Sequence, residues 1–165
     1  MADPDVLLPA ALRSRTSFVL VKLAALVRQQ CAEQVAAAGI SQHQHAILSC
    51  LDEYGPACQK DIAARLGIDG GDTVTYVDGL QRKGLVLRER DERDRRRQIL
   101  TLTPDGRAVL REVEERLDAA EPGVLAVLAD SERAALHDYA VRALAGVTPA
   151  AWGEGDRRES AAAVQ

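Results

Sequence analysis

An arginine-rich loop near the middle of the chain lies between two runs that both have the character of strands, and this arrangement constrains the fold more than any other feature. The loop carries five arginines between Arg90 and Arg97. The run LVLRER precedes it and the run QILTLT follows it. The pattern predicts a β-hairpin, with strands at 85–90 and 98–102 and a strongly basic tip. Taken alone, the charge run would also suit a solvated loop.

Two short helices are predicted directly before this hairpin. The first covers Gln59–Leu66, a turn follows at Gly67–Gly71, and the second helix covers Asp72–Lys83 and is closed by Gly84. A helix-turn-helix followed at once by a hairpin is a winged helix. In such a fold the second helix enters the major groove of DNA, while basic residues of the wing reach phosphates or the minor groove.

Longer helices are predicted on both sides of this core. The first runs from residue 10 to Gly39 and has apolar residues on several sides, including Phe18, Leu20 and Val21. Such a helix needs more than one neighbour, and a partner subunit is one source. Thr103 and Pro104 begin another helix, as N-cap and first helical residue. The expected fold is therefore mainly α with a small β-hairpin wing.

Composition supports a folded DNA-binding protein once charge is located along the chain. The 165 residues suit one domain with a helical extension, and the net charge is −4. Residues 82–97, however, contain eight basic and four acidic side chains, whereas residues 111–165 contain six basic and eleven acidic ones. The basic segment is thus the candidate surface for a polyanion.

Several other function classes lack their sequence signals. The chain has no apolar run long enough to span a membrane, no basic leader, and no nucleophile-elbow, phosphate-loop or HExxH motif. Without these motifs, neither catalysis nor a cofactor is expected. A bound metal is not expected either, since His43 and His45 would point apart on one helix. The three cysteines, Cys31, Cys50 and Cys58, form no CxxC pair and suit a reducing cytoplasm.

The segment Ile40–Leu110 resembles the DNA-binding core of the multiple-antibiotic-resistance regulator (MarR) family. The most specific part is the wing pattern D-x-x-D-R-R followed by L-T-x-x-G, which here comprises Asp91, Asp94, Arg95, Arg96, Leu102, Thr103 and Gly106. The resemblance implies a cytoplasmic homodimer that binds a pseudo-palindromic operator, usually as a repressor, until a small molecule or an oxidant releases it. It divides the chain into a dimerisation region (10–39 and 104–146), a winged helix-turn-helix (40–103) and a tail (147–165) that we expect to be mobile.

The resemblance also assigns roles to individual residues. The recognition helix would present to DNA Gly70, Gly71, Asp72, Val74 and Thr75. The wing would contribute Arg93, Arg95, Arg96 and Arg97, with Asp94 holding a neighbouring arginine in place. The chain departs from the common family pattern at Thr75 and Gly79, where arginine is frequent. Asp72 brings a negative charge near DNA unless it caps the helix.

An effector pocket is the least constrained expectation. In the MarR family a cleft between the dimerisation helices and the winged helix often holds an aromatic acid. By resemblance this cleft would be lined by Phe18, Lys22, His45 and Ser49. Lys22 would pair with a carboxylate, although a surface lysine and a core histidine would explain the same residues.

Two alternatives stay open at this point. A winged helix with few basic residues on its recognition helix could be a protein-interaction module. A regulator that responds to oxidation through Cys31, Cys50 or Cys58 is the other, because Cys58 lies just before a predicted helix N-terminus, where a thiol pKa can fall.

Overall fold

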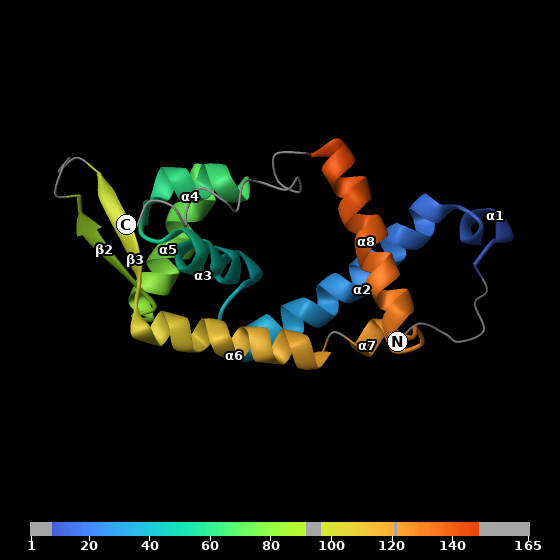
Figure 1. Ribbon diagram of the computed structural model, residues 1–165. Coiled ribbons are helices and arrows are strands. Elements are labelled where there is room, and N and C mark those ends of the chain that lie inside the picture. Colours follow the sequence, from blue (N-terminus) through green and yellow to red (C-terminus); the bar gives the residue numbers. More distant parts are fainter. Residues whose placement is uncertain (1–7, 92–96, 121, 149–165) are drawn as a thin grey trace, which may run out of the picture. The chain divides into compact units, whose positions relative to one another are not determined.

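The computed structural model describes residues 8–91, 97–120 and 122–148. The chain divides into two compact units, Met1–Val124 and Leu125–Gln165, and each is considered by itself. In order, the elements up to the boundary are α1 (Ala10–Arg13), α2 (Thr16–Ala37), α3 (Gln42–Tyr54), β1 (Ala57–Cys58), α4 (Gln59–Leu66), α5 (Gly70–Arg82), β2 (Val86–Arg90), β3 (Gln98–Leu102), α6 (Pro104–Ala120) and α7 (Pro122–Leu125) (Figure 1). The second unit contains α8 (Asp130–Val147).

The predicted fold class is confirmed: the protein is mainly helical and has a winged helix at its centre. The sheet has one strand more than predicted. Its order is β1-β3-β2, and both pairings are antiparallel, with Ala57 opposite Leu100 and Val86 opposite Leu102. A two-residue strand shows no alternation in sequence, so only its pairing with β3 reveals it.

The helix-turn-helix has the predicted parts, but its second helix begins two residues earlier than predicted. Gly67 ends α4 in the left-handed region, at φ 63°. Asp69 then caps α5, because its carboxylate accepts a hydrogen bond of 2.7 Å from the N–H of Gly71. The glycines at 70 and 71 therefore belong to the helix, and Asp72 lies in its first turn without capping it.

The hydrophobic core of the first unit lies where α3, α4, α5 and α6 meet the sheet. Its most deeply buried side chains are Ile47, Leu48, Ile62, Val77, Leu80, Val86, Leu100 and Val113. Of the residues that helical spacing places inside α4 and α5, Ile62, Ala63, Thr73, Val77 and Leu80 are buried, and Leu66 is half-buried. The winged helix thus closes around its own core.

The N-terminal helix differs from the single long helix that the sequence predicts. It is broken at Ser14 and Arg15, where Arg15 is extended and the Ser14 hydroxyl donates to the carbonyl of Ala11 at 3.3 Å. Val35 is the only buried residue in α2, all of which is described. Four large apolar side chains of its first half are exposed, among them Val21 at 68 % and Leu26 at 55 %, whereas Phe18 and Leu23 are half-buried.

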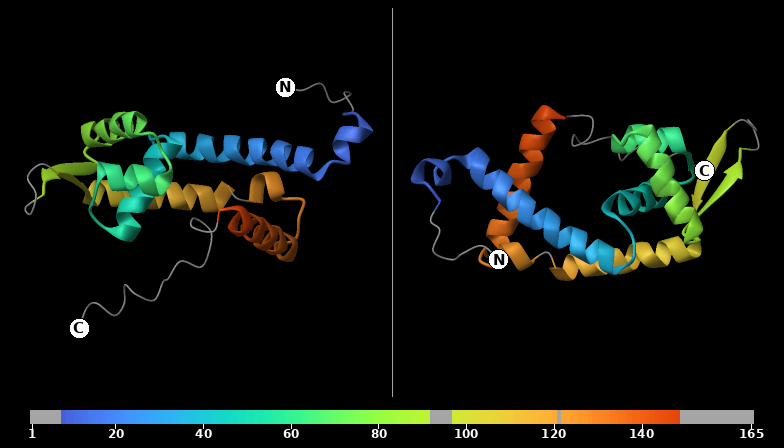
Figure 2. Two further views of the ribbon diagram at one scale, coloured as in Figure 1. Left: turned by 90° about the horizontal axis from the view of Figure 1, so that it is seen from above. Right: turned by 180° about the vertical axis from the view of Figure 1, so that it is seen from behind.

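The start of α6 is held tightly against the wing. Thr103 caps the helix as predicted: its hydroxyl accepts from the N–H of Gly106 at 2.9 Å and donates to the carbonyl of Gly84 at 2.8 Å. Gly106 permits this approach, because a Cβ at that position would lie 2.2 Å from the carbonyl oxygen of Leu85. From there α6 extends to α2, which it contacts (Figure 2).

The second unit contributes one helix of 18 residues, α8, which exposes apolar side chains such as Tyr139 at 65 % and Val147 at 81 %. Most of the predicted tail, residues 149–165, lies outside the described residues. Among the helices that are described, none has both the length and the apolar character needed to cross a membrane.

Candidate nucleic-acid interface

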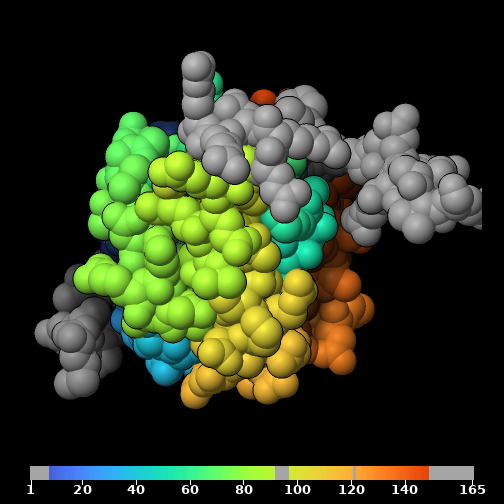
Figure 3. Space-filling view, turned by 90° about the vertical axis from the view of Figure 1, so that its left-hand side faces the viewer, coloured from blue at the N-terminus to red at the C-terminus, as the bar shows by residue number. Residues whose placement is uncertain are grey.

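One face of the first unit is formed by α5 and the hairpin together. Figure 3 shows α5 in green and the strands in yellow-green as neighbours on this face, with the start of α6 beside them. All five residues predicted to face DNA from the helix are exposed: Gly70, Gly71, Asp72, Val74 and Thr75. The intervening Thr73 and Val77 point into the core. Helical spacing therefore separates a contacting face from a packing face.

The N-terminus of α5 carries two carboxylates. Asp69 accepts from the Gly71 N–H and so occupies one of the free donors that would otherwise attract a phosphate. Asp72 lies in the same turn and is exposed. Both charges would disfavour a phosphate at this helix end.

The tip of the wing falls in a part of the chain that is not described. Arg93, Asp94, Arg95 and Arg96 lie outside the described residues, and with them the predicted bracing by Asp94. Arg90 and Arg97 flank this segment, and both are exposed. The backbone N–H of Asp91 donates to the carbonyl of Arg97 at 3.0 Å, which closes the base of the loop.

Arg97 is attached to the helix-turn-helix. Its Nη2 lies 3.1 Å from Oδ2 of Asp61 on α4. Contact with Cys58, and then the nearby carboxylate of Asp61, raise the pKa of Arg97 above its ordinary value. The guanidinium is therefore a permanent positive charge. Because both partners are about half exposed, the ion pair leaves the arginine within reach of a ligand phosphate.

A second ion pair joins the wing to the recognition helix, and sequence reasoning missed it. Arg88 of β2 lies 2.7 Å from Asp78 of α5, measured from Nη2 to Oδ1. The Arg88 Nε is buried without a hydrogen-bond partner. A sequence signal existed, since Asp78 lies three residues after Thr75 on the exposed side of α5. The pair fixes the angle between helix and hairpin.

The four predicted effector-binding residues fall into two separate places. Phe18 and Lys22 line a largely apolar hollow of about 260 Å³ on α1 and α2, together with Leu8, Arg13, Val19, Leu23 and Leu26. The Lys22 Nζ lies 5.6 Å from the centroid of the Phe18 ring. An apolar hollow with two cations at its edge suits an acid that carries an apolar body.

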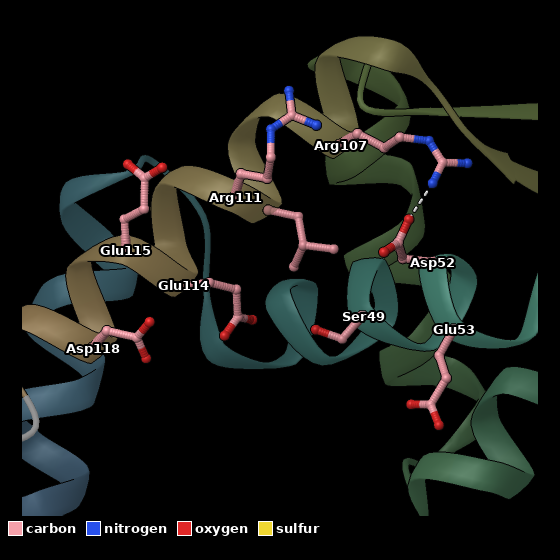
Figure 4. Close-up of a pocket in the computed structure, with 9 residues that line it drawn as sticks. Ser49, Asp52, Glu53, Arg107, Arg111, Glu114, Glu115 and Asp118 are labelled. Atoms are coloured by element: carbon pink, nitrogen blue, oxygen red, sulfur yellow. Dashed lines mark hydrogen bonds and ion pairs between the residues drawn. The ribbon is translucent and has the colours of Figure 1, made fainter. Parts of the chain in front are cut away.

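Ser49 lines a different hollow, between α3 and α6, and His45 contacts Glu114 of that lining. Figure 4 shows its lining, in which Ser49 faces Glu114 across the cleft and Asp52 is paired with Arg107. The Nε2 of His45 lies 2.8 Å from Oε1 of Glu114, and the Ser49 hydroxyl donates to the carbonyl of His45. Acidic side chains outnumber basic ones here, so the cleft does not suit a carboxylate.

Cysteines and metal ligands are dispersed. Cys50 is buried, while Cys31 and Cys58 are half-buried, and all three are free thiols. In the described part of the chain, no three His, Cys, Asp or Glu side chains gather in a way that could hold a metal ion.

A family model described as MarR family matches residues 40–97, which run from the start of α3 to the end of the wing loop, just before β3. A protein of Thauera aromatica, whose name describes a transcriptional regulatory protein for the hcr operon, is 29 % identical over 98 residues, covering 59 % of this chain and 59 % of its own length. Among solved structures, YusO from Bacillus subtilis is 26 % identical with a TM-score of 0.67, covering 84 % of this chain and 99 % of its own. CouR from Rhodococcus jostii RHA1, bound to p-coumaroyl-CoA, is 25 % identical with a TM-score of 0.68, covering 86 % of this chain and 97 % of its own. Residues 40–97 thus belong to the MarR family.

Members of the MarR family are transcriptional regulators and not enzymes. The two positions at which this member departs from the common pattern have different surroundings. Thr75 is exposed, and its hydroxyl makes a long hydrogen bond of 3.4 Å to the carbonyl of Gly71. Gly79 is buried against α3. Of the two departures, only Thr75 changes the face that a MarR protein would turn toward DNA.

Proposed function

We propose that this MarR-family protein is a cytoplasmic, sequence-specific DNA-binding repressor. The observation that carries the proposal is the shared face of α5 and the hairpin, with Gly70, Gly71, Asp72, Val74 and Thr75 exposed along the helix. Val74 would contact a thymine methyl group and Thr75 a base edge or phosphate, while the wing arginines reach the backbone or the minor groove. Because base-contacting side chains are few, DNA shape contributes to the choice of operator.

The functional form is proposed to be a homodimer on a pseudo-palindromic site. The exposed apolar residues of α2 support this, since isolated chains rarely leave such a surface in water. The exposed apolar residues of α8, in the second unit, also suit an interface with another chain. Two copies related by a two-fold axis would place two recognition helices on successive major grooves of one DNA face.

The proposed effector is an acid with an aromatic or otherwise apolar body. The hollow beside Phe18 and Lys22, with Arg13 at its edge, offers apolar contact and two positive charges. CouR, a structural neighbour, was solved with p-coumaroyl-CoA, which combines an aromatic acyl group with phosphates. Binding beside α2 would alter the spacing of the two winged helices and release DNA.

The test is fluorescence anisotropy of the full chain with the intergenic DNA upstream of its own gene and with a scrambled duplex of the same composition. Titrations between about 50 and 200 mM salt give a log–log slope near −0.9 for each phosphate contacted. A steep slope together with a preference for the upstream DNA is the expected result. Weak binding without preference would replace the repressor proposal by a protein-interaction module.

A redox-responsive regulator is the second candidate, favoured by the contact between Cys58 and Arg97 at the base of the wing. A peroxide would oxidise that thiol to a sulfenic acid, with release of water or an alcohol, and would thereby change its contact with the arginine. Operator titrations before and after peroxide treatment, with Cys58→Ser as the control, distinguish this mechanism from ligand release.

A further inference from the structure

The first turn of α3 contacts the middle of the recognition helix through the amide of Gln44. The Oε1 atom accepts from the backbone N–H of Ser41 at 3.0 Å, while Nε2 donates to the carbonyl of Tyr76 on α5 at 3.2 Å. The Ser41 hydroxyl accepts from the N–H of Gln44 at 3.2 Å, which completes a capping box. The two ends of one amide therefore have separate tasks, one within α3 and one on α5.

The amide reaches α5 because Gly79 leaves room for it. A Cβ at position 79 would lie only 2.5 Å from the Gln44 Nε2, closer than carbon and nitrogen approach without a bond. Alanine or any larger residue there would push the amide away from the Tyr76 carbonyl. The glycine thus explains how a side chain of α3 can contact the backbone of α5.

Tyr76 is contacted a second time from the same turn of α3. The rings of His43 and Tyr76 stack, with centroids 4.7 Å apart and planes 5° from parallel. Tyr76 directly follows Val74 and Thr75, which lie on the exposed face of α5. Rotation of α5 about its axis would turn these two side chains and break both contacts to α3 together.

We propose that Gln44 is a positioning residue for operator recognition, because its amide fixes the rotation of α5 through the carbonyl of Tyr76. The inference rests on the proposed function, since it requires that α5 reads DNA. Loss of one such hydrogen bond is expected to lower the preference for operator over scrambled DNA about fivefold. The capping of α3 is a separate task of the same side chain and can be tested separately.

Two variants divide the tasks. Gln44→Glu keeps an oxygen that accepts from Ser41, and glutamate is a favoured partner in a capping box, but it places an acceptor against the Tyr76 carbonyl. Ser41→Ala removes the cap and keeps the bond to α5. We expect Gln44→Glu to lose operator preference with little change in melting temperature. Ser41→Ala should keep the preference and melt about 3 °C lower.

The new negative charge of Gln44→Glu needs a matched control. Gln42→Glu adds the same charge in the same turn of α3, at an exposed residue whose amide donates to the carbonyl of Arg28 on α2. Simple repulsion would weaken binding of operator and scrambled DNA alike in both variants. A loss confined to operator DNA, and to Gln44→Glu, supports positioning.

Gly79→Ala is an independent variant that introduces no charge. Its methyl group should displace the Gln44 amide and reproduce the loss of preference, and the double variant with Gln44→Glu should be no worse than either single one. If the wild-type protein shows no preference, the proposed function fails. If the wild type shows preference and both variants retain it, the positioning role of Gln44 is wrong.

Discussion

The winged helix and the N-terminal helix α2 belong to the same unit of the chain, but the first buries its apolar residues and the second exposes most of them. In the winged helix, Ile47 and Leu48 of α3 are fully enclosed. In α2, Val21 and Leu26 are more than half exposed, although the helix is just as apolar. The winged helix therefore buries its apolar residues within one chain, whereas the proposed homodimer would cover those of α2 with a second chain.

The largest effect should come from making the exposed side of α2 polar. Val19 and Leu26 lie seven residues apart on one side of the helix, and we expect Val19→Asp with Leu26→Asp to prevent dimerisation, because burying unpaired carboxylates is costly. Operator affinity should fall about hundredfold or more as the two half-sites are no longer bound together. Light scattering gives the mass, and circular dichroism shows whether the winged helix stays folded. A dimer that persists would contradict the comparison.

A core substitution should instead lower the stability of the single chain, independently of dimerisation. Leu80→Ala removes a fully buried side chain from α5 and should destabilise the fold by about 2–5 kcal/mol. Because the loss lies within one chain, the decrease in melting temperature should be similar at low and high protein concentration. Thermal melts over a hundredfold range of concentration would show this, with Leu87→Ala, at an exposed position of β2, as the control.

Effector binding at the hollow on α2 should depend on its cation. Lys22→Met keeps the aliphatic stem and removes the charge, so affinity for an acid should fall about tenfold. Benzoate and p-coumaroyl-CoA are suitable probes in isothermal titration. His45→Gln, which removes the partner of Glu114 in the separate cleft between α3 and α6, should leave this affinity unchanged. Loss in His45→Gln and not in Lys22→Met would place the ligand in the other cleft.

The smallest expected effect concerns the base of the wing. Asp61→Asn removes the carboxylate that pairs with Arg97, and we expect operator affinity to rise about threefold, because exposed ion pairs contribute little to stability and the arginine becomes available to phosphate. Anisotropy titrations measure the change. A fall in affinity would instead show that the pair holds the wing in place.

Sequence periodicity was sufficient to predict which side of α5 in the winged helix is buried. Thr73, Val77 and Leu80 repeat at helical spacing along α5, and their burial follows directly from that spacing. The predicted start of α5 was wrong by two residues, because paired glycines suggest a turn. The hydrogen bond from the Gly71 N–H to the Asp69 carboxylate instead places both glycines in the helix. The N-cap at Asp69 thus outweighed the low helix propensity of the two glycines.

Contacts between distant segments could not be predicted in this way. β1 exists only because Ala57 and Cys58 pair with β3, about forty residues later in the chain. Likewise, the role of Gly79 depends on Gln44, which no spacing rule connects to it. The effector residues divided between two hollows for the same reason, since helical spacing within α2 and α3 does not fix which sides of the helices share a cavity.

The close contact between Gly106 and the carbonyl of Leu85 has a consequence for allosteric signalling. Because α6 begins in direct contact with the backbone of Leu85, the helix and the wing cannot move independently. The other end of α6 is tied to α2, where the Gln30 amide donates to the carbonyl of Ala120 and accepts from the N–H of Val124. We therefore expect a displacement of α2 to be transmitted through α6 and to move the winged helix with it.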